Sequence, residues 1–318
     1  MSMQLDSGSR LDFSAHRPKI TIENERLQSL QWRFALATVL IPLIGSIVAV
    51  GLLPLWGIGW IEIGLLVSLY SLSAIGITVG FHRYFAHCAF KTSLPVKIIL
   101  LFLGSMAAQG PVIHWVSHHR RHHQYSDQPE DPHSPYINEG KSLSWWHGLW
   151  HSHTGWMLNS KISNSALFAK DLLRDPVIIK MNRLYLVWVA LGLVIPTVVG
   201  GLLTWTWVGA VQGLLWGGFV RLFLAHHFIW TIGSIAHIYG NRPLKTDDYS
   251  TNNPWLVIQN FGESWHNNHH AFPNSAMFGL EWWQIDLGAW VIRTLEKFGL
   301  VWDVKTPTRG MINNKKIL

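Results

Sequence analysis

Four long apolar runs alternate with polar stretches along the chain. They cover about 34–56, 58–80, 184–205 and 207–232. Each run reaches the roughly 20 residues that an α-helix needs to cross a bilayer. The only acid of the second run is Glu62, and the fourth run is interrupted by Arg221, His226 and His227. The pattern predicts four transmembrane helices.

The runs pair into two hairpins. The short uncharged segments PLWGIGW and TWTW join the members of each pair. Lys and Arg concentrate before the first hairpin, between the hairpins and after the second, and such loops face the cytoplasm. We therefore predict an all-α integral membrane protein with both termini cytoplasmic. Residues 1–33 form a polar N-terminal segment, and 34–318 form one domain whose cytoplasmic helical cap comprises 81–183 and 233–318.

A fifth apolar segment, 96–115, fits a span less well. It contains Lys97, Gly104, Gly110 and Pro111, and histidine-rich sequence flanks it on both sides. Those flanks would lie on opposite sides of the membrane if the segment crossed it. We interpret it as a buried or interfacial helix.

Composition supports a membrane protein. The chain is 49% hydrophobic and 14% charged, whereas soluble domains are nearer a quarter charged. Many of the 19 Trp residues lie at the ends of apolar runs, as in an interfacial aromatic belt. The alternative is a soluble protein with an aromatic core. Positive-inside topology explains the net charge of +7 more simply than nucleic-acid binding does.

Cysteine usage limits the redox chemistry. Cys88 is the only cysteine, which excludes an intramolecular disulfide, a Cys-rich zinc site and iron–sulfur ligation by this chain alone. Any electrons must then arrive from another protein. The polar beginning of the chain lacks the early apolar core of a secretory signal.

The 18 histidines are placed unevenly. Most gather after the predicted spans, on one side of the membrane. These are His82 and His87, then His118, His119, His122 and His123, then His237, and finally His266, His269 and His270.

Helix geometry gives these spacings a meaning. Residues at i, i+3 and i+4 share one face of a helix. We therefore expect each HxxHH triplet, 119–123 and 266–270, to point its imidazoles at one place. His118 fits less well, since it pairs at such spacing only with His122. His82 and His87 are five residues apart and would meet one metal at a frayed helix end, or two different metals.

Many imidazoles with few carboxylates suit iron, zinc, copper or nickel. Eight or more ligands exceed what one ion accepts, so two ions are the economical interpretation. Isolated histidines are usually packed or solvated side chains, and we interpret five that way: His16, His114, His133, His147 and His151. His153, His226 and His227 lie between these ordinary histidines and the clustered ones in the strength of their signal. Because a polar group within a span costs free energy, either His226 or His227 is a candidate hydrogen-bond partner of a metal ligand.

The boxes HRYFAH, HRRHH and HNNHH resemble those of membrane fatty-acyl desaturases. The pattern is most similar to the group that contains stearoyl-CoA desaturases and the cyanobacterial and plant acyl-lipid Δ9 desaturases. The resemblance runs from Gly80 to Asp286 and includes SDQPEDPHSP (126–135) and SHTGW (152–156). It implies a non-haem diiron centre with two Fe2+ on the cytoplasmic face. The implied ligands are His82, His87, His119, His122, His123, His237, His266, His269 and His270.

One position departs from the family pattern. The family has an Asn, acting through a water, four residues before the ligand that corresponds to His237. This chain has Gly233 there. Either the water bonds elsewhere, or another group such as His227 compensates.

The resemblance also implies an activity. O2-dependent desaturation would introduce a cis double bond, at Δ9, into a saturated long acyl chain that is lipid-linked or CoA-linked. Trp115 and Trp230 would line the substrate tunnel. Ferredoxin would supply electrons, docking around Arg83, Arg120 and Arg121. The protein would be located in the thylakoid or plasma membrane if the chain is cyanobacterial.

Alternatives remain open at this point. The same centre would support acyl or alkane hydroxylation. A haem-binding membrane electron carrier would need histidines paired within the spans, and a metal transporter would need polar residues in several spans. The sequence does not choose between lipid, CoA and acyl carrier protein, nor does it give chain length, bond position or oligomeric state.

Overall fold

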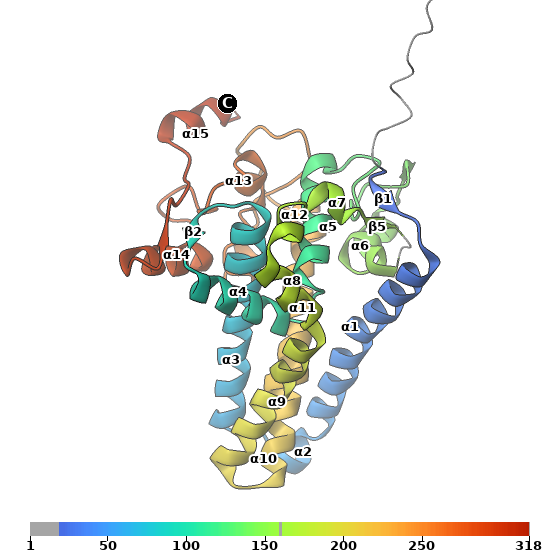
Figure 1. The fold of residues 1–318 in the computed structure, drawn as a ribbon, viewed down its shortest axis with the longest axis vertical. Coiled ribbons are helices and arrows are strands. Elements are labelled where there is room, and N and C mark those ends of the chain that lie inside the picture. Colours follow the sequence, from blue (N-terminus) through green and yellow to red (C-terminus); the bar gives the residue numbers. More distant parts are fainter. Residues whose placement is uncertain (1–18, 159–160, 318) are drawn as a thin grey trace, which may run out of the picture.

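Helices make up most of the computed structural model, which describes residues 19–158 and 161–317. Among these residues, four helices are long and apolar enough to cross a bilayer. They run through the lower part of the molecule, beneath a cap of shorter helices (Figure 1). The predicted all-α architecture with four membrane-spanning helices is confirmed.

Two of the four spans change helix type along their length. The spans are α1 (Glu25–Gly51); α3 (Trp60–Ile75) continuing as the π-helix η2 (Gly76–Ala86); α9 (Tyr185–Thr204); and α10 (Trp207–Gln212), the π-helix η5 (Gly213–Val220), α11 (Arg221–Gly233) and α12 (Ile235–Ile238) in succession.

Both hairpin turns lie at the end of the molecule away from the cap (Figure 1). The short helix α2 (Leu53–Trp56) connects α1 to α3, and Trp205, with a left-handed φ of 54°, ends α9. Thr206 then caps α10 by accepting the Gly209 N–H at 2.9 Å. Trp60, Trp205 and Trp207 are exposed at these turns, as expected of aromatic residues at a membrane surface.

The first and fourth spans extend beyond their predicted limits. The first begins at Glu25, because Asn24 caps the helix by accepting the Leu27 N–H at 3.0 Å. The amphipathic turns before residue 34 therefore belong to the helix rather than to a separate polar segment. The fourth continues to Ile238, which brings His237 onto its last turn.

The apolar segment 96–115 breaks into two helices, and neither is long enough for a span. The helix α4 (Leu94–Met106) has 13 residues and is shorter than a span. Gly110, with a φ of 100°, and Pro111 precede the next helix, α5 (Val112–Tyr125). This turn directs α5 and its histidines into the cap.

The rest of the cap consists of short elements. The helices are α6 (Trp145–His153), η3 (Gly155–Leu158), α7 (Ser165–Phe168), η4 (Leu172–Arg174), α8 (Pro176–Arg183), η6 (Pro254–Leu256), α13 (His266–Ala271), α14 (Leu287–Lys297) and α15 (Arg309–Lys315). Antiparallel pairs form between β1 (Thr21–Ile22) and β5 (Ile162–Ser163), β2 (Lys91–Thr92) and β6 (Val301–Trp302), and β3 (Ile137–Asn138) and β4 (Lys141–Ser142). In the first two pairs Thr21 lies opposite Ser163 and Lys91 opposite Trp302, so both ends of the described chain are tied to the cap.

Close backbone packing fixes α4 against the π-helix η2. A Cβ on Gly76 would collide with the backbone of Leu103 and Gly104, and one on Gly104 would collide with the Phe81 ring. Phe81 belongs to the largest buried cluster, which joins η2, α4 and α5. This contact sets the position of His82, the next residue, relative to the histidines of α5.

A buried arginine joins the spans below the cap. The Arg221 side chain is fully buried and donates to the carbonyls of Gly217 at 3.1 Å, Met106 at 2.8 Å and Gly192 at 2.7 Å, and to Ser73 Oγ at 2.9 Å. Pro196 has no N–H and leaves the Gly192 carbonyl without its helical donor. Arg221 supplies that donor.

We expect Arg221→Met to lower the midpoint of thermal unfolding in detergent. The substitution removes all the hydrogen bonds that the Arg221 guanidinium donates to Gly217, Met106, Gly192 and Ser73. Each buried carbonyl left unsatisfied costs about 1–3 kcal/mol. Exposed Arg174 provides the control, Arg174→Met. Equal unfolding midpoints for the two variants would show that the hydrogen bonds of Arg221 do not stabilise the packing of the spans.

Candidate metal centre

Histidines from four parts of the chain meet in the cap. His82 and His87 come from the end of η2, His119, His122 and His123 from α5, His237 from α12, and His266, His269 and His270 from α13. They form two groups. The five-histidine group is His82, His87, His119, His123 and His269; the four-histidine group is His122, His237, His266 and His270.

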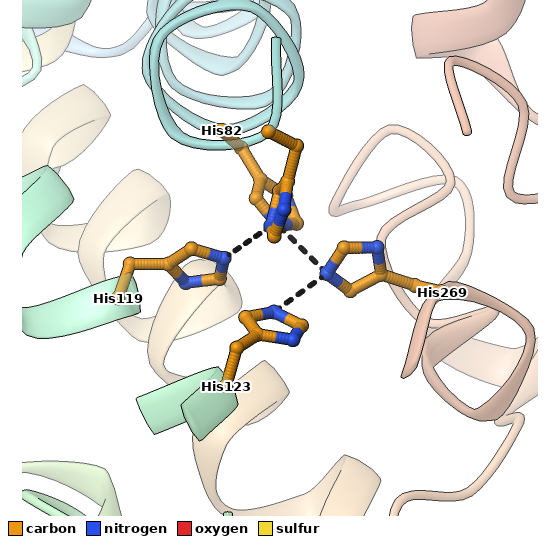
Figure 2. Close-up of side chains that lie close together, drawn as sticks. His82, His119, His123 and His269 are labelled. Atoms are coloured by element: carbon orange, nitrogen blue, oxygen red, sulfur yellow. Dashed lines mark hydrogen bonds between the residues drawn. The ribbon is translucent and has the colours of Figure 1, made fainter. Parts of the chain in front are cut away.

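Within each group, one nitrogen of every ring lies within 4.8 Å of the others. Figure 2 shows His82, His119, His123 and His269 of the five-histidine group pointing toward a common centre. All nine residues predicted as ligands are therefore brought together, in two places.

Each HxxHH triplet divides between the groups, contrary to the expectation that it would serve one place. His119 and His123 join the five-histidine group, while His122 joins the other; His266 and His270 are likewise separated from His269. An α-helix turns 100° per residue, so neighbours such as His122 and His123 point in different directions. Residues at i and i+4 stay together, and the residue at i+3 reaches the second group.

The π-helix explains how His82 and His87 reach the same group. The His87 N–H donates to the His82 carbonyl at 3.1 Å, a bond between residues five apart. In such a widened turn residues i and i+5 come to lie on nearly the same side. Of the two alternatives that the sequence left open, the structure brings both histidines to one group, through a widened turn rather than a frayed helix end.

The nitrogens facing the two centres are close enough to share a cation. His87 Nε2 lies 2.7 Å from His119 Nε2, and His82 Nε2 lies 3.0 Å from His269 Nε2. In the four-histidine group, His266 Nε2 lies 3.1 Å from that of His237 and 3.0 Å from that of His270. A proton on one nitrogen satisfies one neighbour, whereas a cation accepts every lone pair, so this donor set fits metal ions.

Four acids hold the opposite nitrogens of these rings. His122 Nδ1 donates to Asp131 at 3.0 Å, His237 Nδ1 to Asp127 at 2.9 Å and His270 Nδ1 to Asp248 at 2.6 Å. His82 Nδ1 contacts Glu263 in the same way. These bonds fix the tautomer that leaves Nε2 free to bind metal. Sequence analysis did not predict the acids, because no short spacing relates them to the histidines; only the 126–135 stretch marked two of them.

Burial keeps six of the nine rings neutral. It lowers the pKa of His87, His119, His123, His266 and His269 well below the usual value. It lowers the pKa of His270 to about 4, although Asp248 opposes the effect. The lone pairs needed for metal binding are therefore available at neutral pH.

Arg83 supports the centre from behind. It donates to both oxygens of Asp286, at 2.9 and 3.2 Å, and to Glu263 at 3.3 Å, and its side chain is fully buried. Burial raises the pKa of Glu263 to about 8, against the effect of Arg83. A cation held by His82 would add positive charge and favour the carboxylate.

This placement overturns the predicted ferredoxin-docking residues. Arg83 and Arg121 are buried, and Arg121 Nε donates to the Glu130 carbonyl at 2.8 Å. Arg120 donates to the Phe85 carbonyl at 2.8 Å and pairs with Asp171 at 2.6 Å. These arginines bond to acids and carbonyls of the same chain, which lie far from them in sequence or were not recognised as partners. They therefore stabilise the fold.

A largely apolar cavity of about 400 Å³ ends at the histidines. Both predicted tunnel residues, Trp115 and Trp230, line it, with Ile77 and Ile229 beside them. Residues of α1, including Phe34, form another part of its wall. The cavity borders both groups, since its lining includes His82 and His119 of one and His122 and His266 of the other.

The remaining histidines lie outside the two groups. His118 Nδ1 is 3.3 Å from the His114 carbonyl, in agreement with the choice of His119 as the ligand. His227 contacts His153, with 3.0 Å between their nitrogens, rather than the space at Gly233. His226 Nε2 is 2.7 Å from the Ala107 carbonyl.

His147 is exposed and His151 buried, whereas His16 lies outside the described residues. His133, predicted to be an ordinary packed side chain, stacks on His122.

The fatty acid desaturase family model matches residues 63–305. The chain is a member of the fatty acid desaturase family. The matched region contains all nine histidines and the four acids of this desaturase, whereas α1, which lines part of the cavity, lies before it.

Individual relatives differ in substrate. The chain is 51% identical over 321 residues to hex-5-enoyl-[acyl-carrier protein] acetylenase of Moorena producens, covering 100% of both chains. It is 38% identical over 260 residues to sn-1 stearoyl-lipid 9-desaturase of Synechocystis, covering 80% of this chain and 76% of the relative. It is 38% identical over 255 residues to Delta-9 acyl-lipid desaturase 1 of Arabidopsis thaliana, covering 79% and 77%.

We expect Asp248→Asn to weaken metal binding by this desaturase about 10–100-fold, because the amide no longer fixes the His270 tautomer. Metal retained against increasing chelator measures the effect. The control is Asp303→Asn, which removes an exposed carboxylate paired with Lys91. Equal retention by both variants would contradict the role given to Asp248.

Proposed function

We propose that the chain is an O2-dependent acyl desaturase whose nine histidines hold two iron ions. The observation that carries the proposal is the pairing of two all-histidine groups, of five and four ligands, at the end of an apolar cavity. Buried neutral imidazoles suit iron among the transition metals. Membership of the desaturase family supports iron over zinc, copper or nickel.

Bound in this way, the iron pair would supply the oxidising chemistry toward O2 that side chains lack. In the overall reaction two hydrogens leave adjacent carbons, and two electrons and two protons from outside complete the reduction of O2 to two waters. The chain's own residues hold the substrate. Trp115, stacked on His119, and Trp230 line the cavity, where they would orient the acyl chain and exclude water.

A second candidate activity is conversion of a double bond to a triple bond on an acyl-carrier-protein-linked chain. The full-length match at 51% identity to an acetylenase of that substrate class favours it, since the acyl-lipid relatives match at 38% over about four fifths of the chain. A six-carbon chain has no Δ9 position. The predicted Δ9 acyl-lipid activity and the acetylenase activity are therefore distinct hypotheses about one centre.

We also propose the orientation predicted from the Lys and Arg distribution, with both termini and the metal centre cytoplasmic. Because Cys88 is the only cysteine, this chain alone cannot hold a cysteine-ligated iron–sulfur cluster, and a soluble carrier such as ferredoxin is the proposed electron donor. Its docking surface must differ from Arg83 and Arg121, which are buried.

Expression in a host without desaturases tests the activity. Lipids and acyl carrier protein from the same cells are analysed by mass spectrometry. Loss of two hydrogens from saturated chains supports desaturation, loss of two from a monounsaturated chain supports acetylenase activity, and gain of one oxygen supports the hydroxylase alternative.

We expect His269→Ala to abolish product and to lower the iron content, because His269 is a member of the five-histidine group. Its Nε2 lies 2.9 Å from that of His123. Exposed His147 provides the matched control, His147→Ala, which should retain both iron and activity. Two iron ions per chain in the wild-type protein and in His269→Ala alike would refute the proposed ligand set.

A further inference from the structure

His133 lies against the four-histidine group without belonging to it. Its ring stacks on that of His122, with centroids 4.3 Å apart and an angle of 25°. Its backbone N–H donates to Asp131 Oδ1 at 3.0 Å, the oxygen that also accepts from His122 Nδ1 at 3.0 Å. One carboxylate therefore holds the ring of His122 and the backbone of His133.

The Nδ1 atom of His133 is buried and has no hydrogen-bond partner among the described residues. It lies 4.0 Å from Asp131 Oδ1, too far for a hydrogen bond. A buried polar atom left in this state costs about 1–3 kcal/mol. His133 also lines the cavity that ends at the histidines.

Gly233 creates the space in front of this nitrogen. A Cβ at position 233 would lie 3.2 Å from His133 Nδ1 and 3.7 Å from the Ser152 carbonyl. The φ of Gly233 is not in the left-handed region, so the backbone does not require glycine there. What the glycine provides is room.

The space adjoins the four-histidine group. Gly233 ends α11, and the His133 ring beside it stacks on His122, a member of this group. His122 Nε2 and His266 Nδ1, both on residues of this group, are buried and also lack partners among the described residues. This group offers one histidine fewer than the five-histidine group, so a metal ion held here would accept a further ligand such as water.

We propose that His133 is a positioning residue whose Nδ1 hydrogen-bonds a water molecule bound to the metal of the four-histidine group. Gly233 leaves the space that this water occupies, at the position where the resemblance led us to expect an amide. Such a water has polar partners on both sides, as a buried water requires. The inference rests on the proposed metal centre.

Iron retention tests the proposal without relying on activity. Wild-type protein, His133→Ala and His133→Gln are equilibrated with increasing chelator, and iron per chain is measured. We expect His133→Ala to lose one of two ions about tenfold more readily than wild type, and His133→Gln, whose amide can still bond water, to lie close to wild type. The control is His118→Ala, a buried cavity-lining histidine whose nitrogen contacts the His114 carbonyl.

A second variant separates chemistry from folding. Gly233→Asn in the His133→Ala background places an amide in the same space, and we expect it to restore retention of the second ion. The proposal is overturned if His133→Ala retains both ions as His118→Ala does, or if His133→Gln loses iron as His133→Ala does. A wild-type protein that binds no iron would instead refute the proposed function itself.

Discussion

Imidazole nitrogens that face one another at about 3 Å cannot all carry protons, and in this chain eight of the nine rings are held in that relationship, with His122 beside them. The arrangement is stable only if the rings are neutral and a cation or a limited set of protons occupies the space between them. Burial keeps six of the nine neutral, and Asp127, Asp131, Asp248 and Glu263 fix the tautomers of four. The cap organises these contacts, and the spans deliver His82 and His237 to it.

Much of the fold can be predicted from the pattern of apolar and polar residues along the sequence. The apolar runs place the spans, because length and hydropathy suffice for a helix in lipid. The helix limits differ where a local cap such as Asn24 extends the helix into polar sequence. The break between α4 and α5 also follows from Gly110 and Pro111, which do not continue a helix.

The candidate centre was only partly predictable. The HxxHH spacing identified histidines that gather, but their division between two groups depends on where α5 and α13 face each other. His82 and His87 reach the same group through a π-helical turn, and a spacing of five residues does not by itself predict such a turn. The carboxylate partners lie between 9 residues (Asp131 with His122) and 181 residues (Glu263 with His82) from their histidines. The buried state of Arg83 depends on Asp286, 203 residues away. No common spacing relates these pairs.

Arg221 bears on how the protein is made. A lone arginine at the centre of a helix costs about 2.5–3.5 kcal/mol to insert into a membrane. Its partners lie on three other elements: Ser73 on the first hairpin, Met106 at the end of α4 and Gly192 on α9. All three are synthesised before Arg221. The last span thus enters the bilayer beside acceptors already in place, so the order of synthesis matches the order in which this charge can be stabilised.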